Sequence, residues 1–171
     1  MKILLTGSSG TIGTRLFEAL LPHYQVVGVD LVQNKWNLEL NAHTVIADLR
    51  RKEELAKLPL NLDLVIHFAA NARVYELVRR PDLALDNILI TFNVLEFMRR
   101  NSISKMIFAS SRETYGNIMG AEPLSEDRVR LENCESPYSA SKISGEAMIR
   151  AYSKVYGIDF VIVRFSNVSV S

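Results

Sequence analysis

The sequence predicts an α/β fold in which helices cover both faces of a doubly wound parallel sheet. Short apolar runs rich in β-branched and aromatic residues alternate along the chain with longer amphipathic runs. A glycine-rich turn follows the first apolar run, where the first strand of such a sheet connects to its first helix. Because connections between parallel strands are right-handed, a doubly wound sheet is the natural topology for this pattern.

Six brief apolar runs predict buried parallel strands, at residues 3–5, 26–29, 44–46, 64–68, 106–109 and 160–163. Four amphipathic runs predict helices, at residues 12–21, 51–58, 83–100 and 138–156. The stretch 116–137 combines Gly, Pro, Asn and many charges, which predicts a long loop. Such a loop either forms a lip of an active site or is a solvated connection.

The composition fits one globular domain and excludes several classes of partner. Hydrophobic residues make up 48% of the 171 residues, which is enough for a buried core. Lys and Arg total 20 against 19 Asp and Glu, so the net charge of +1 favours neither nucleic acid nor a membrane surface. No apolar run is long enough to span a bilayer. The single cysteine, Cys134, indicates a reducing cytoplasm and no thiolate metal cluster, and we expect no metal site.

The segment that follows the first predicted strand has the features of a phosphate-binding turn. It reads Thr-Gly-Ser-Ser-Gly-Thr-Ile-Gly, with glycines at Gly7, Gly10 and Gly13. Gly7 allows a sharp turn, Gly10 leaves room for a pyrophosphate, and Gly13 allows close packing of the helix. The free N–H groups at the helix start favour an anion. An ordinary glycine turn is the alternative, and no Gly-Lys-Ser/Thr follows to make a P-loop.

Asp30 ends the second predicted strand, where an acidic side chain can accept hydrogen bonds from the ribose hydroxyls of a dinucleotide. Its charge would repel a 2′-phosphate. The next residues, Leu31, Val32 and Gln33, supply no arginine to receive one. The sequence therefore predicts NAD rather than NADP as the cofactor.

Two segments further along the chain predict catalytic groups. Tyr138 and Lys142 lie four residues apart, so they share one face of a helix that begins after Ser136. We expect the lysine and the helix start to lower the pKa of Tyr138 and so make it a general base. Ser110 and Ser111 end the fifth strand, and we expect Ser111 to act with Tyr138. The alternatives are a structural tyrosine and turn-forming serines.

Taken together, these motifs resemble the extended short-chain dehydrogenases/reductases, the NAD-dependent epimerase/dehydratase family, along essentially the whole chain. Further matching positions are Asp48-Leu49, His67-Phe68-Ala69-Ala70, Asn87, Tyr115-Gly116 and Arg164 to Asn167. The resemblance implies an NAD-binding Rossmann domain over residues 1–171. The cofactor-binding residues that it implies are Gly7, Ser9, Gly10, Thr11, Ile12, Gly13, Asp30, Asp48, Leu49, Phe68, Ala69, Ala70, Asn87, Ser110, Tyr138 and Lys142. His67 is expected to be structural.

The resemblance also implies a nucleotide-sugar 4-epimerase that acts on UDP-glucose and UDP-galactose by transient transfer of hydride from carbon 4 to NAD. The implied catalytic residues are Ser111, Tyr138 and Lys142, and the implied substrate-binding residues are Ser111, Glu113 and Asn167. Related dehydratases carry an Asp-Glu pair where this chain has Arg112 and Glu113, and arginine cannot donate a proton near neutral pH. Dehydration is therefore disfavoured, whereas Glu113 keeps decarboxylation open.

Two further expectations concern the extent of the chain and its assembly. Family members continue into a substrate-binding part, which we expect to be missing or truncated after residue 171, so a non-catalytic NAD-binding module is an alternative. We expect a homodimer through the helix from Leu83 to Arg100 and the helix from Tyr138 to Tyr156. The apolar residues expected on these two helices include Leu85, Ile88, Leu89, Phe92, Leu95, Ala147, Ile149 and Val155.

Overall fold

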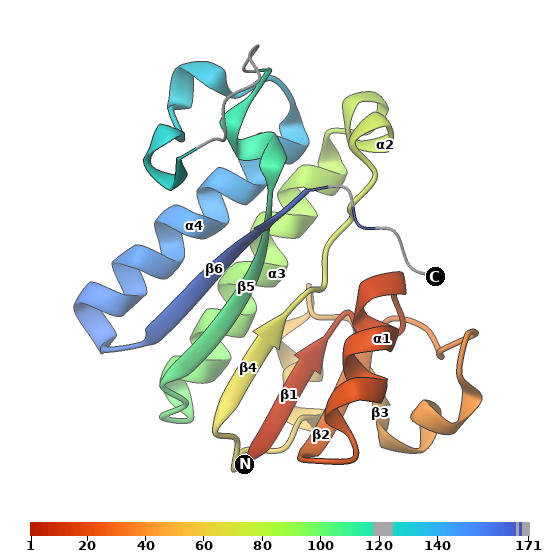
Figure 1. Cartoon of the computed structure of the whole chain (residues 1–171). Coiled ribbons are helices and arrows are strands. Elements are labelled where there is room, and N and C mark those ends of the chain that lie inside the picture. The colour runs from red at the N-terminus through yellow and green to blue at the C-terminus, as the bar shows by residue number, and fades with distance from the viewer. Residues whose placement is uncertain (118–124, 167, 169–171) are drawn as a thin grey trace.

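In the part of the chain that the structure describes, six parallel strands form the central sheet, in the order β3-β2-β1-β4-β5-β6 (Figure 1). This computed structural model describes residues 1–117, 125–166 and 168. The strands are β1 (Lys2–Thr6), β2 (Gln25–Asp30), β3 (Thr44–Ile46), β4 (Leu64–His67), β5 (Lys105–Ser111) and β6 (Asp159–Phe165). The strand order reverses between β1 and β4, which confirms the doubly wound parallel sheet that the sequence predicts.

Among residues 1–117, 125–166 and 168, four α-helices accompany the sheet. They are α1 (Thr11–Leu20), α2 (Val74–Arg79), α3 (Asp82–Arg100) and α4 (Pro137–Tyr156). Short 3-10 helices connect the larger elements, namely η1 (Leu38–His43), η2 (Lys52–Lys57), η3 (Arg112–Tyr115), η4 (Glu126–Arg128) and η5 (Leu131–Asn133). None of the helices in the described ranges is both long and apolar enough to cross a bilayer.

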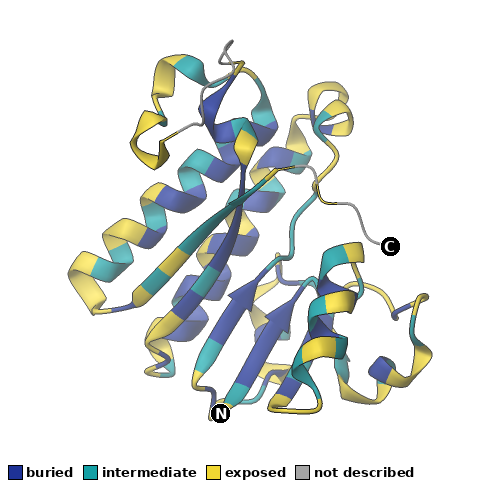
Figure 2. Cartoon of the chain, viewed as in Figure 1, coloured by how far each residue is buried: buried dark blue, intermediate teal, exposed yellow. Residues whose placement is uncertain are grey.

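The two faces of the sheet carry separate apolar cores. On one face, Ile3 and Leu5 pack with Phe17 of α1. On the other face, Leu4 belongs to a larger cluster that includes Met98 of α3 and Ile149 of α4. This alternation follows from the period of two along a strand. Figure 2 shows that the central strands are mostly buried, while the outer faces of the helices and parts of β6 are exposed.

Some predicted elements differ from the structure. The helix predicted at 51–58 is only the 3-10 helix η2, because Pro59 forces Leu58 into an extended conformation with ψ 149°. Helices α2 and η1 were not predicted, and the predicted loop 116–137 contains η4 and η5 within its described part. Leu95 and Ile149, which the sequence assigned to a dimer surface, are fully buried in the core, so that assignment is wrong for these two residues.

Candidate active site

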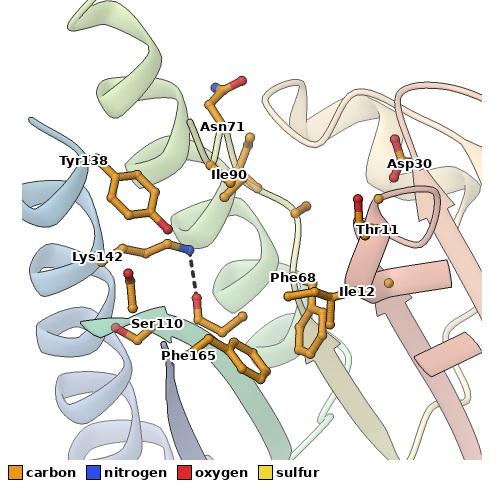
Figure 3. Close-up of a pocket in the computed structure, with 18 of the residues that line it drawn as sticks. Thr11, Ile12, Asp30, Phe68, Asn71, Ile90, Ser110, Tyr138, Lys142 and Phe165 are labelled. Carbon is orange, nitrogen blue, oxygen red and sulfur yellow. Dashed lines mark hydrogen bonds between the residues drawn. The ribbon is translucent and has the colours of Figure 1, made fainter. Parts of the chain in front are cut away.

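A cavity of about 930 Å³ extends along the carboxyl ends of β1, β2, β4 and β5 (Figure 3). Among the residues that line it are nearly all the predicted site residues, namely Gly7, Ser9, Gly10, Thr11, Ile12, Gly13, Asp30, Asp48, Leu49, Phe68, Ala69, Ala70, Ser110, Ser111, Glu113, Tyr138 and Lys142. Asn167, predicted to bind substrate, lies outside the described residues. Residues from the two ends of the sequence thus share one concave site.

The glycine turn has the backbone geometry that its sequence predicts. Gly7 adopts φ +72°, and a Cβ atom there would lie 2.7 Å from the backbone nitrogen of Ala69. A Cβ atom on Gly13 would collide with the carbonyl oxygen of Gly7. Gly10 caps α1 without a side-chain hydrogen bond, so the first N–H groups of the helix are free to bind an anion such as a pyrophosphate.

A buried asparagine that the sequence analysis missed supports this turn from below. Asn34 is 1% exposed, and its Nδ2 donates to the Oγ1 of Thr14 at 2.8 Å and to the carbonyl of Ser8 at 3.3 Å. Its Oδ1 accepts from the backbone N–H groups of Trp36 and Asn37, both at 2.9 Å. One amide therefore fixes the glycine turn to the loop after β2, and no periodicity or motif in the sequence marks it.

Asp30 ends β2 and directs its carboxylate towards the cavity (Figure 3). One carboxylate oxygen accepts from the N–H of Ser9 at 2.9 Å, and the other accepts from the N–H of Val32 at 3.3 Å. These bonds hold the carboxylate at the glycine turn, which suits hydrogen bonding to ribose hydroxyls. Arg50 also lines the cavity, but its guanidinium is bound to Asp48 and Asp86 at 2.8 and 2.9 Å.

Asn87 does not line the cavity, so its expected contact with the cofactor stays a prediction. The residue is 4% exposed and lies behind Asn71. Its Oδ1 accepts from the N–H of Asn71 at 2.7 Å, and its Nδ2 donates to the carbonyl of Asn71 at 3.0 Å. Asn71 itself lines the cavity (Figure 3), so the buried amide supports the lining instead of forming it.

Tyr138 and Lys142 lie on the first turns of α4, as predicted. The helix begins with Pro137 after a capping box in which Ser136 and Ser139 exchange hydrogen bonds. Tyr138 is 7% and Lys142 is 5% exposed. The Nζ of Lys142 donates to the carbonyl of Ala109 at 2.8 Å, the dashed line in Figure 3, and lies 5.8 Å from the centroid of the Tyr138 ring. Lys142 therefore connects the helix to the end of β5 beside Ser110 and Ser111.

Burial determines the ionisation of both side chains. It lowers the pKa of Lys142 to about 8, while the charge of Glu146 acts in the opposite direction. Burial also raises the pKa of Tyr138, a shift that the Ser111 hydroxyl opposes and the Glu113 carboxylate reinforces. The predicted lowering of the Tyr138 pKa is therefore wrong for this structure. The reason is that burial of the phenol outweighs the hydrogen bond with Ser111.

A buried ion pair lies beneath this end of the cavity. Glu146, one helical turn after Lys142, accepts two hydrogen bonds from Arg164 at 2.9 and 2.8 Å. It also accepts a hydrogen bond from the hydroxyl of Ser110 at 2.6 Å. Arg164 further donates to the hydroxyl of Tyr115 at 3.1 Å. The network joins α4 to the ends of β5 and β6. No pattern in the sequence marks Glu146 beyond its spacing from Lys142.

His67 has the environment of a structural residue. Its Nδ1 lies 2.7 Å from the hydroxyl of Thr6, and its Nε2 lies 3.3 Å from the hydroxyl of Thr91. Burial, reinforced by the charge of Lys142, lowers its pKa to about 3, so the ring is neutral at physiological pH. The residue does not line the cavity.

Known proteins similar to this chain share the fold and the family. A putative UDP-glucose 4-epimerase of Methanocaldococcus jannaschii is 39% identical over 97% of this chain, and the chain covers 55% of it. UDP-glucose 4-epimerase of Thermus thermophilus, solved with NAD, has a TM-score of 0.88 and 31% identity, with 96% of this chain and 54% of that chain covered. UDP-glucuronic acid 4-epimerase of Bacillus cereus, solved with UDP-glucuronic acid and NAD, has a TM-score of 0.83 and 34% identity, with 96% and 56% covered.

This chain spans about half the length of the curated relatives that it matches. Residues 3–169 match the NAD dependent epimerase/dehydratase family, whose cofactor is the one that Asp30 and the glycine turn predict. The chain therefore belongs to the NAD dependent epimerase/dehydratase family.

Proposed function

We propose that the protein is an NAD-dependent nucleotide-sugar 4-epimerase and that residues 1–171 make up its NAD-binding domain. UDP-glucose and UDP-galactose are the proposed substrates. The observation that carries the proposal is that Ser111, Tyr138 and Lys142 line the same cavity as the glycine turn and Asp30. A module that only binds a dinucleotide has no use for a buried lysine and a tyrosine at the far end of the cofactor cavity.

The chain's own residues have distinct proposed roles. The glycine turn and Asp30 hold the pyrophosphate and a ribose of the cofactor. Tyr138 takes the proton from the sugar 4-hydroxyl, Ser111 donates a hydrogen bond to the same oxygen, and Lys142 holds the second ribose. Bound NAD supplies the reversible hydride acceptor. If the hydride came back to the other face of carbon 4 and Tyr138 returned the proton to the oxygen, the reaction would be an isomerisation with no net oxidation.

The raised pKa of Tyr138 matters for this role. A phenol whose pKa is raised stays protonated near pH 7, so almost none of it is present as the phenolate that could accept a proton. Positive charge brought near the phenol lowers its pKa again, and an oxidised nicotinamide ring carries such a charge. We therefore infer that Tyr138 works as a base in the cofactor-bound protein and not in the free protein.

Decarboxylation is the second candidate, because Glu113 lines the same cavity as Ser111 and Tyr138. Dehydration is disfavoured, since Arg112 occupies the position of a proton donor and cannot give up a proton near neutral pH. A non-catalytic NAD-binding module remains as the third candidate. If this third candidate is right, the wild-type protein binds NAD but does not convert any nucleotide sugar.

We also infer a cytoplasmic homodimer. The single cysteine, Cys134, fits a reducing compartment. On α3, Leu85, Leu89 and Phe92 are 65%, 39% and 43% exposed, and Val155 on α4 is 68% exposed. Apolar side chains gathered on two adjacent long helices favour pairing with a second copy.

The test of the proposed function is the Tyr138→Phe variant of the full-length gene product. We expect it to keep its NAD affinity, measured by calorimetry, and to lose turnover by about 10²–10⁴-fold in the interconversion of UDP-glucose and UDP-galactose. Tyr152→Phe is the matched control, because Tyr152 lies on the same helix but bonds to Glu96 away from the cavity. A Tyr138→Phe enzyme that keeps more than about a tenth of the wild-type rate would refute the assignment.

A further inference from the structure

The cavity carries a cation for which the proposed function has no use. Arg112 is the first residue of η3 and follows Ser111 directly in the chain. Arg112 is among the residues that line the same cavity as Ser111, Tyr138 and Lys142, and its side chain is 48% exposed. Glu113 is an acidic neighbour, with a separation of 3.8 Å between its Oε1 and the Nε of Arg112, which is too long for a hydrogen bond. The guanidinium makes no hydrogen bond with any other residue in the described ranges.

The other arginines around the site are fully engaged. Arg50 is bound to Asp48 and Asp86 at 2.8 and 2.9 Å. Arg164 is bound to Glu146 at 2.8 Å. A guanidinium that has five N–H donors and one distant acidic neighbour is poised to bind an anion from outside the chain.

The distribution of charge along the cavity points to the same kind of ligand. At the end formed by Ser111 and Tyr138, the described lining contains Arg112 and Lys142 against a single acid, Glu113. At the other end, Asp30, Asp48 and Asp86 line the cavity with Arg50. The reactive end therefore has a surplus of positive charge, and a sugar that carries a negative charge would complement it.

On the basis of the proposed 4-epimerase function, we propose that Arg112 binds the sugar carboxylate of a nucleotide hexuronic acid, so that an acidic sugar is preferred as the substrate over the neutral UDP-glucose and UDP-galactose named above. Ser111 is assigned to the oxygen on carbon 4, and a hexuronic acid carries its carboxylate on carbon 5, the neighbouring ring atom. The residue next to Ser111 along the chain is thus suited to reach that group. The planar guanidinium can bind a carboxylate through two parallel hydrogen bonds, which the neutral hydroxymethyl group of glucose cannot match.

The diphosphate that all nucleotide sugars share is the other anion within the substrate, and the experiment must separate the two. The full-length protein loaded with NAD is assayed with UDP-glucuronate and with UDP-glucose, as wild type and as Arg112→Gln. We expect the wild-type kcat/KM to be at least about tenfold higher for UDP-glucuronate. Arg112→Gln should lower kcat/KM for UDP-glucuronate by about 10–100-fold more than for UDP-glucose.

Two further variants complete the design. Arg112→Lys keeps the positive charge but not the planar guanidinium. It should therefore recover part of the preference for UDP-glucuronate over UDP-glucose that Arg112→Gln loses. Arg15→Gln, an exposed arginine on α1 outside the cavity lining, is the matched control and should leave the ratio of the two substrates unchanged. An equal loss for both substrates in Arg112→Gln would indicate a diphosphate contact and overturn the proposal, as would a wild type that prefers UDP-glucose.

Calorimetry with the NAD-loaded protein keeps the inference separate from the proposed function. If wild type binds UDP-glucuronate more tightly than UDP-glucose and Arg112→Gln removes that difference, the carboxylate site stands even when no epimer forms. In that case the proposed epimerase function would be wrong, while the proposed carboxylate site would still hold. Equal binding of both sugars by wild type would overturn the carboxylate site, whatever the turnover.

Discussion

Glu146 and Arg164 form a buried ion pair with two hydrogen bonds, of 2.9 and 2.8 Å, directly behind the residues assigned to catalysis. Their side chains are 7% and 11% exposed, so water screens the pair only weakly. The bond from Ser110 to Glu146 and the bond from Arg164 to Tyr115 extend the pair to β5 and η3. The pair therefore holds together the elements that present Ser111 and Lys142 to the cavity.

Removing one member of this pair should destabilise the protein strongly. Arg164→Met leaves the Glu146 carboxylate buried without its main partner, which typically costs about 3–5 kcal/mol in the free energy of unfolding. Urea unfolding followed by circular dichroism measures this loss. Arg80→Met is the control, because the Arg80–Asp82 pair is 64% and 62% exposed and should contribute nothing measurable. A loss for Arg164→Met as small as that of the control would show that the pair does not support the site.

Local patterns in the sequence predict much of this fold because they follow from local physical rules. The glycine turn needs a positive φ at Gly7, and the carboxyl ends of parallel strands collect Asp30, Phe68 and Ser111 at one edge. Local sequence patterns do not reveal hydrogen bonds and ion pairs between segments that are far apart along the chain. Asn34 looks like an ordinary loop residue until the fold brings it under Thr14, and nothing local connects Glu146 to Arg164.

The predicted pKa of Tyr138 was wrong for a related reason. A spacing of four residues places Lys142 on the same helix face as Tyr138, but it does not say which acceptor the ammonium chooses. The carbonyl of Ala109 comes from another strand and takes that hydrogen bond. The depth of burial, which raises the pKa of the phenol, is also a property of the assembled fold.

Asp30 should determine the preference for NAD over NADP. We expect the wild-type chain to bind NAD at least about tenfold more tightly than NADP, a difference of about 1.4 kcal/mol. Asp30→Asn removes the charge that repels a 2′-phosphate, so the difference in affinity between NAD and NADP should become smaller. The amide oxygen still accepts from the N–H of Ser9, so the glycine turn should stay intact. Calorimetric titration with both cofactors measures the ratio. The control is Asp63→Asn, at the opposite end of the sheet, and a wild type that binds NADP equally well would contradict the prediction.

The proposed dimer makes a prediction about the exposed apolar residues of α3. Leu89→Glu combined with Phe92→Glu places two charges on the surface that we expect a second copy to cover, and burial of unpaired charge opposes association. Light scattering should show a dimer for the wild-type chain and a monomer for the double variant. Leu60→Glu, a 56% exposed position outside these helices, should leave the dimer intact. A wild-type monomer at high concentration would count against the interface.

Lys142 should make the folded protein less stable at neutral pH than it would be with an apolar residue in its place. Burial lowers the pKa of Lys142 from 10.5 to about 8, which corresponds to a cost of about 3 kcal/mol for keeping the charged form folded. The full cost is present below pH 8, where the lysine is protonated in both the folded and the unfolded states. Between pH 8 and 10.5 the unfolded chain holds the proton and the folded chain does not, so stability rises with pH across this window.

Lys142→Met should therefore be more stable than the wild type at pH 7, by about 2 kcal/mol once about 1 kcal/mol is deducted for the unpaired carbonyl of Ala109. Urea unfolding at pH 7 and pH 10 tests the sign, because the advantage of the variant should largely disappear at pH 10. Lys105→Met, at the exposed start of β5, is the control. Its free energy of unfolding should differ from that of the wild type by the same amount at pH 7 and at pH 10. A less stable Lys142→Met protein at pH 7 would mean that the lysine is structural. A stabilised variant that binds NAD more weakly would indicate that the lysine is retained for the cofactor in spite of its cost to folding.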